Sequence, residues 1–122
     1  MKKMILILDD EEALTELISQ DLRARGYDAY GLVSKAKGLA WSKLYKPDLI
    51  ISDINSPNMN GFEFLSKLRS NNKTKDTPVI IVSGTCSGGE YNLRLISLGA
   101  NACLAKPLVD DDLLKEIKRL IG

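Results

Sequence analysis

The sequence contains no histidine. This absence excludes a Ser-His-Asp hydrolase, a zinc site with histidine ligands and a phosphohistidine relay carried by this chain. Any chemistry must therefore use carboxylates, lysine, hydroxyls, thiols or a hard metal ion.

Cysteine is also scarce. The two cysteines, Cys86 and Cys103, are too few for a disulfide framework and lack metal-ligand spacing. We expect both to be reduced thiols.

Long apolar runs and excess charge are absent as well. The apolar run Met4–Leu8 is too short for a signal peptide or a membrane span, so we expect a cytoplasmic protein without membrane insertion. A net charge of +1 gives no reason to expect direct contact with nucleic acid. The 122 residues, 44% of them hydrophobic, suit one globular domain over residues 1–122.

The remaining pattern is a fivefold alternation of apolar strands and amphipathic helices. Strands are predicted at 4–8, 27–33, 49–53, 78–82 and 101–105. The helices between them carry start or stop signals: the acids of 9–12, Gly26, Ser34 as N-cap, Pro47, Gly61, a capping box at 87–90, Gly99 and Pro107. Such alternation predicts a doubly wound α/β fold of the (βα)5 flavodoxin-like type, with a five-stranded parallel sheet in the order 2-1-3-4-5.

Helical spacing predicts which side chains of the first three helices face the core. The expected inward residues are Leu14, Leu17, Ile18 and Leu22, then Leu39, Ala40, Leu44 and Trp41, then Phe62, Leu65 and Leu68.

Polar side chains follow four of the predicted strands. Asp9 and Asp10 end the first, Asp53 the third, Ser83 the fourth and Lys106 the fifth. In the predicted strand order the reversal of direction falls between strands one and three, where ligands bind in such sheets. Three carboxylates gathered there repel one another unless protons, a cation or lysine lie close by. A site made of oxygen ligands with room for water suits Mg²⁺, or Mn²⁺, better than zinc.

These parts support phosphoryl transfer. Asp53 can attack a phosphoryl donor and become an aspartyl phosphate, as carboxylate nucleophiles do. Lys106 and the Ser83 hydroxyl would take up charge on the transferred group together with the metal.

The polar residues at the strand ends match the motifs of a known family. The chain resembles the receiver domain of two-component response regulators, of the chemotaxis-regulator type. The resemblance covers essentially all 122 residues and rests on Asp9-Asp10-Glu11, on Asp53 followed by Pro57, Met59 and Gly61, on Ser83, and on Lys106-Pro107.

The resemblance implies the following roles. Asp53 is the phosphoacceptor, Asp10 a direct Mg²⁺ ligand and Asp9 a ligand through water. The Asn55 main-chain carbonyl also ligates the metal, and the Lys106–Pro107 peptide is cis. The donor is a phosphohistidine of a sensor histidine kinase or phosphotransfer protein, and phosphorylation changes the face of the fourth helix and fifth strand to control an output domain or effector. The chain is then not an enzyme beyond catalysing its own phosphorylation and slow autodephosphorylation.

The switch departs from the family pattern. Cys103 stands where the family usually has a tyrosine or phenylalanine that turns inward when the hydroxyl residue, here Ser83, moves to the phosphoryl group. A cysteine cannot fill the same volume. The transmission of the signal through Ser83 and Cys103 is therefore expected to differ.

Two alternatives remain beside the phosphoacceptor. A degenerate pseudo-receiver would bind a partner without phosphorylation; the complete acidic set argues against it and Cys103 favours it. An aspartate-nucleophile phosphatase would usually have a second acid two residues after the nucleophile, where this chain has Asn55.

The resemblance leaves the partners of the output face open. Dimerisation through the fourth and fifth helices is common in the family. No helix-turn-helix follows the last helix, so an output domain would lie in another polypeptide or beyond Gly122.

Overall fold

The computed structural model describes residues 2–54, 59–84, 90–106 and 110–122. Strands and helices alternate as predicted. In chain order they are β1 (Met4–Leu8), α1 (Glu12–Ala24), β2 (Asp28–Leu32), α2 (Lys35–Tyr45), β3 (Leu49–Asp53), α3 (Gly61–Arg69), β4 (Val79–Ser83), α4 (Glu90–Ser97), β5 (Ala102–Ala105) and α5 (Asp110–Ile121).

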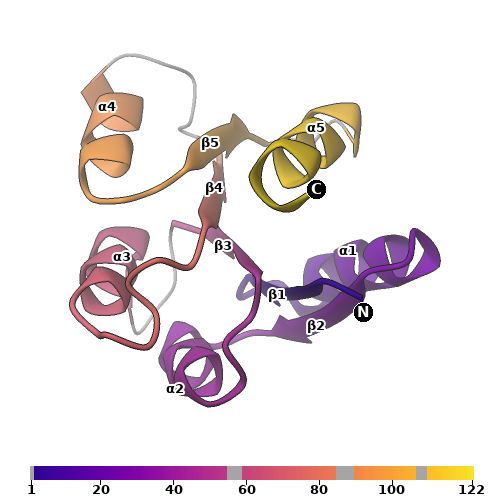
Figure 1. Ribbon diagram of the computed structural model, residues 1–122. Helices are drawn as coiled ribbons and strands as arrows, with labels where there is room; N and C mark the ends of the chain where they lie inside the picture. Colours follow the sequence, from indigo (N-terminus) through magenta and orange to yellow (C-terminus); the bar gives the residue numbers. More distant parts are fainter. Residues whose placement is uncertain (1, 55–58, 85–89, 107–109) are drawn as a thin grey trace.

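The strands form one parallel sheet in the order β2-β1-β3-β4-β5. Helices α1 and α5 cover one face, and α2, α3 and α4 cover the other (Figure 1). The predicted doubly wound, flavodoxin-like fold and its strand order are therefore confirmed.

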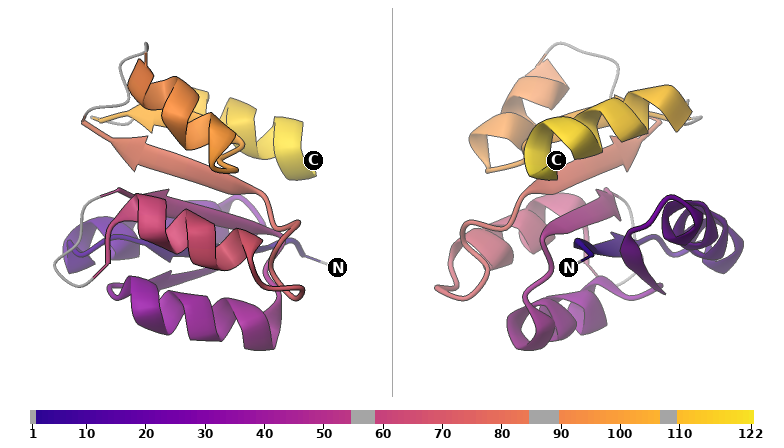
Figure 2. Two further views of the ribbon diagram at one scale, coloured as in Figure 1. Left: turned by 90° about the vertical axis from the view of Figure 1, so that its left-hand side faces the viewer. Right: turned by 45° about the vertical axis from the view of Figure 1, so that its right-hand side comes forward.

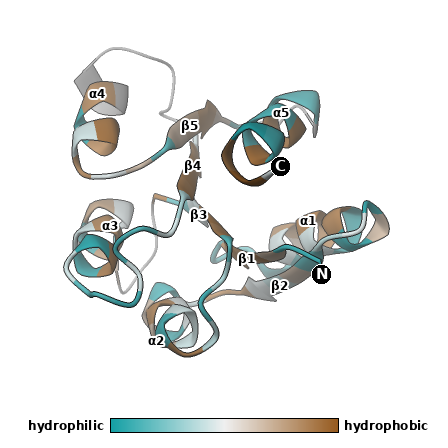
Figure 3. Cartoon of the chain, viewed as in Figure 1, coloured by the Kyte–Doolittle hydropathy of each residue, from teal (hydrophilic) through white to brown (hydrophobic). Residues whose placement is uncertain are grey.

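The sheet separates two apolar cores. One contains alternate strand residues packed against α2, α3 and α4; the other contains the remaining strand residues packed against α1 and α5. Every residue of β3 and β4 is buried, because these inner strands have helices on both faces. Figure 3 shows the resulting distribution, with hydrophobic strands in the middle.

The buried face of α1 differs from the prediction. Leu22 is buried as expected, but the side chain of Leu17 is 65% exposed, and Thr15 and Ser19 lie inside instead. A Cβ added to Gly31 of β2 would lie 3.0 Å from Ser19 Oγ and 3.1 Å from Thr15 Cβ. The helix approaches β2 so closely that only small side chains fit between them.

The buried face of α2 also differs from the prediction. Ser34 caps it as predicted, its side chain accepting a hydrogen bond from the Lys37 N–H. Leu39 is buried, whereas Ala40 and Leu44 are exposed, so the prediction was wrong for these two.

The buried face of α2 instead contains Lys35, Gly38, Leu39 and Ser42. Trp41 is half-buried against the core beneath the helix.

In α3, Leu65 and Leu68 are buried as expected. Phe64 is buried with them, and Phe62 is only half-buried.

Parallel pairing brings all five strand ends to one edge. The register sets Leu8 beside Ser52, Asp53 beside Val82 and Ser83 beside Ala105. The residues that follow these strands therefore meet at the same edge. Both chain termini lie at the opposite end of the molecule (Figure 2).

None of the helices in the described part of the chain combines the length and apolar character needed to cross a membrane.

Candidate functional site

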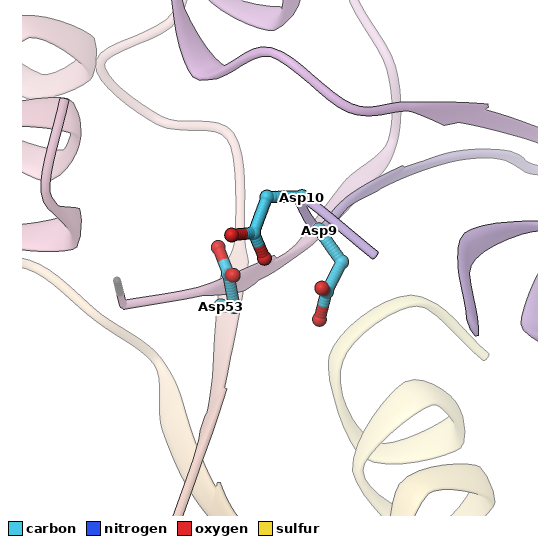
Figure 4. A group of neighbouring side chains, drawn as sticks. All are labelled: Asp9, Asp10 and Asp53. Atoms are coloured by element: carbon cyan, nitrogen blue, oxygen red, sulfur yellow. The ribbon is translucent and has the colours of Figure 1, made fainter. Parts of the chain in front are cut away.

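Three aspartates meet where β1 and β3 end. Each of Asp9, Asp10 and Asp53 offers a carboxylate oxygen within 4.8 Å of those of the other two. Asp9 and Asp53 are 6% exposed, and Asp10 faces solvent. Figure 4 shows the Asp10 carboxylate next to that of Asp53, with Asp9 alongside. The predicted convergence of these three residues is confirmed.

Asp9 is held from several sides. Its N–H donates to the Leu32 carbonyl at 3.3 Å, which ties the end of β1 to β2. One carboxylate oxygen accepts from the Glu11 N–H at 2.9 Å, and the other accepts from Lys106 Nζ at 2.9 Å. These bonds fix the Asp9 side chain within the cluster.

Lys106 and Ser83 lie at the neighbouring strand ends. The Lys106 N–H donates to the Ser83 carbonyl at 3.1 Å, and Ser83 is buried. The Lys106 side chain is 33% exposed and reaches across to Asp9. Lys106 therefore approaches the acidic cluster as predicted, and it forms an ion pair there with Asp9.

A second lysine, which the sequence analysis missed, enters the cluster from α2. Lys35 is 3% exposed, and its ammonium donates a hydrogen bond to Asp53 Oδ1 as part of a buried ion pair. The available signal was its position: Lys35 follows strand two closely, and the carboxyl end of that strand lies at the same edge of the sheet.

The environment of Asp53 sets its ionisation. Burial is the largest influence and raises the pKa of the Asp53 carboxyl above its ordinary value. The charge and hydrogen bond of Lys35 lower this pKa, while the negative charges of Asp9 and Asp10 raise it further. The acidic cluster thus favours a cation, whose positive charge would reduce the repulsion between Asp53 and the carboxylates of Asp9 and Asp10.

The donor set fits a hard cation. The ligands that the cluster offers are carboxylate oxygens. One of them, the Asp10 carboxylate, is exposed, so water can reach the cluster on that side. Mg²⁺ prefers such oxygen ligands and usually retains several waters, so a few protein ligands suffice.

The prediction that Cys103 is a reduced thiol was wrong. It is disulfide-bonded rather than a reduced thiol. The residue is half-buried and packs against the core under α3 and α4.

Several predicted features lie outside the described residues. They are the Asn55 carbonyl, the loop residue Pro57, Cys86, most of the capping box at 87–90 and the Lys106–Pro107 peptide. Met59 and Gly61, which complete the motif after Asp53, are described. The Gly61 N–H donates to the Ile54 carbonyl at 2.6 Å and so returns the chain to the end of β3.

Comparison with known families agrees with this geometry. Residues 5–118 match the model of the response regulator receiver domain. The chain is 32% identical over 119 residues to the DNA-binding dual master transcriptional regulator RpaA of Synechocystis, covering 96% of this chain and 48% of RpaA. It is also 32% identical over 117 residues to the cell cycle response regulator CtrA of Brucella ovis, covering 96% and 49%. The chain spans about half the length of these curated relatives.

Solved structures give the same result. The chemotaxis response regulator CheY4 of Vibrio cholerae superposes with a TM-score of 0.91 at 29% identity, covering 99% of this chain and all of CheY4. A CheY-like receiver domain protein of Methanospirillum hungatei superposes with a TM-score of 0.88 at 31% identity, covering 98% and 93%.

Proposed function

This chain belongs to the response regulator receiver domains of two-component systems, and we propose that it works as a phosphoacceptor, with Asp53 as the residue modified. The observation that carries the proposal is the buried Asp53 carboxylate at the end of β3, surrounded by two further carboxylates and two lysines. We further propose that residues 1–122 form a single receiver domain.

The chemical step follows from these side chains. An Asp53 oxygen attacks phosphorus and forms an O–P bond, while the bond from phosphorus to the donor breaks and the donor leaves with its electron pair. With a phosphohistidine donor, the departing atom is an imidazole nitrogen. The donor histidine belongs to the partner, because this chain has none.

The remaining residues stabilise the transferred group. Asp9, Asp10, Asp53 and the Asn55 carbonyl would hold Mg²⁺ (or Mn²⁺), Asp9 through water. The metal, when bound, neutralises charge on the phosphoryl oxygens. Lys106 supplies a further positive charge from β5, and the Ser83 hydroxyl supplies a hydrogen-bond donor from β4. Catalysis then consists of positioning and electrostatics.

We propose a signalling role for this chain rather than repeated turnover of a substrate, because its product would be the phosphorylated chain itself. The chain would catalyse its own phosphorylation and slow autodephosphorylation. Movement of Ser83 toward the phosphoryl group would alter the face formed by α4 and β5. Helix α4 exposes Leu93 and Ile96. The bonded Cys103 would make transmission through β5 differ from that of relatives with an aromatic residue there.

The partners follow from the family. Receiver domains of response regulators interact with histidine kinases and output domains. For this chain we propose a sensor histidine kinase or phosphotransfer protein as the donor, in the cytoplasm. An output domain or effector protein would read the α4–β5 face, with a homodimer through α4 and α5 as one form of that contact.

Binding of beryllofluoride, which mimics an aspartyl phosphate, tests the proposed site. With Mg²⁺, it should raise the melting temperature of the wild-type protein by about 5 °C or more, because a ligand that binds only the folded state stabilises it. Asp53→Ala should abolish the shift. An equal shift in Asp53→Ala would place the ligand elsewhere and remove Asp53 from the mechanism.

A further inference from the structure

The burial of Lys35 requires an explanation. Lysine is almost never fully buried unless its charge is paired. Lys35 is also the first residue of α2, where the helix dipole is positive, and no acidic residue occupies the first turn of this helix. Both the burial and the position disfavour the ammonium, so the ion pair with Asp53 must offset them.

The backbone of α2 keeps Lys35 close to the site. A Cβ added to Gly38 would lie 2.5 Å from Leu8 Cδ2, so the first turns of α2 pack directly on the end of β1. Ser34 caps the helix immediately before Lys35. The Cα of Lys35 is thus fixed near the strand ends, and its flexible stem carries the ammonium to Asp53 Oδ1.

Charge in the cluster is nearly balanced without a metal. Three carboxylates face two ammonium groups, since Lys35 pairs with Asp53 and Lys106 pairs with Asp9. The carboxylate most needed by a metal therefore already has a cationic partner. A divalent cation and the Lys35 ammonium would repel each other strongly at such short range.

We infer that Lys35 is an intramolecular competitor for the divalent cation, so that metal binding at Asp53 requires the Lys35 ammonium to leave Oδ1. Lys35 thereby weakens Mg²⁺ binding while neutralising Asp53 in the metal-free protein. This inference rests on the proposed function, because it takes Asp53 as the metal-binding phosphoacceptor.

Titration of Mg²⁺ by calorimetry tests the inference directly. Lys35→Met and Lys35→Gln should bind Mg²⁺ about tenfold more tightly than the wild type, because a charge-assisted hydrogen bond no longer has to be broken. The matched control is Lys37→Met, which removes an exposed positive charge from the same helical turn. It should change the affinity by less than about twofold, since exposed charges are screened.

Equal or weaker Mg²⁺ binding by both Lys35 variants would overturn the inference. If neither variant folds without metal, refolding is followed against Mg²⁺ concentration, and the midpoint is multiplied by the folded fraction at zero Mg²⁺ to give the intrinsic dissociation constant. An intrinsic constant below that of the wild type supports competition, and one equal to it or above it contradicts competition.

Failure of the proposed function gives a different result. If the wild type binds no Mg²⁺ and acetyl phosphate does not label Asp53, the phosphoacceptor proposal itself fails. If the wild type binds Mg²⁺ and is labelled, but the Lys35 variants bind like the wild type, only the role of Lys35 fails.

Discussion

Asp53 must satisfy two conflicting requirements at the residue scale. A nucleophilic carboxylate has to be ionised, yet burial raises the pKa of Asp53 and so favours its protonated form. The Lys35 ammonium opposes that shift in the metal-free protein. Asp9 is paired separately with Lys106, so each buried carboxylate has its own lysine.

Lys106 should be required for phosphorylation but not for metal binding. Lys106→Met removes a positive charge that would stabilise the transferred phosphoryl group, and we expect the rate of labelling by acetyl phosphate to fall about a hundredfold. Mg²⁺ binding should persist, because Lys106 is not a metal ligand. The control is Lys115→Met, which removes an exposed lysine of α5. An unchanged labelling rate in Lys106→Met would exclude Lys106 from the mechanism.

The sequence predicted most of these residues for a simple physical reason. Asp9, Asp53 and Lys106 stand at the ends of strands that are plainly apolar, and parallel strands end at a common edge. Lys35 was missed because it is separated from its strand by Val33 and Ser34 and reads as a surface residue of an amphipathic helix. Its burial depends on how closely α2 packs on β1, which the pattern of polar and apolar residues does not specify.

At the element scale, the contact between α2 and β1 depends on Gly38. In an unobstructed helix Gly→Ala stabilises by up to about 1 kcal/mol. Here the new Cβ would lie 2.5 Å from Leu8 Cδ2, so Gly38→Ala should lower the free energy of unfolding by about 1–3 kcal/mol. Urea unfolding followed by the fluorescence of Trp41, the single tryptophan, measures the change.

Gly84→Ala provides the comparison for Gly38→Ala. Among the described residues other than its chain neighbours, none comes within 4 Å of a Cβ at Gly84, so its substitution should change stability by less than about 0.5 kcal/mol. A neutral or stabilising Gly38→Ala would show that α2 can move away from β1 at little cost.

Arg69 joins three elements at the other end of the sheet. From the last residue of α3, its guanidinium donates to the carbonyls of Thr74, Thr77 and Gly99 and to the side chain of Asn101, at 2.7–3.3 Å. Arg69→Met leaves these acceptors, of which Thr74 is buried and Thr77 and Gly99 are half-buried, without their donor and should cost about 2–4 kcal/mol of unfolding free energy. Lys67→Met, an exposed change on the same helix, should cost little. Equal effects of the two changes in urea unfolding would contradict the anchoring role.

Helix faces were predicted less well than helices. Leu17 and Leu44 follow the helical spacing but are exposed, at 65% and 72%. Their places inside are taken by small residues such as Ser19 and Ser42, both fully buried. Hydroxyls can be buried on a helix because they donate to a carbonyl four residues earlier, as Ser19 does to Thr15 and Ser42 to Gly38.

For the whole molecule, the strand order could be predicted because βα alternation with short connections leaves few topologies. The disulfide at Cys103 could not be predicted, because pairing of two cysteines requires a spatial proximity that their spacing in the sequence does not reveal.

Metal and pH should act together on global stability. The pKa of Asp53 is raised in the folded state, so the stability it contributes is present at low pH and is lost as the pH rises through that pKa. Mg²⁺ should offset this loss. At near-neutral pH, excess Mg²⁺ should add about 2–3 kcal/mol to the free energy of unfolding, and the gain should shrink as the pH is lowered and protons compete with the metal for the carboxylates. A gain in Asp10→Asn equal to that of the wild type would contradict stabilisation by a metal at the acidic cluster, since Asp10 is the proposed direct ligand.

Covalent labelling by acetyl phosphate with Mg²⁺, read by intact-protein and peptide mass spectrometry, tests the assignment of Asp53 most directly. The wild type should gain one phosphoryl group on the peptide that contains Asp53, and Asp53→Asn should gain none. Asp48→Asn, which changes an exposed carboxylate just before the start of the same strand, should be labelled like the wild type. A label that persists in Asp53→Asn, or a wild type that takes up no label, would contradict the phosphoacceptor assignment.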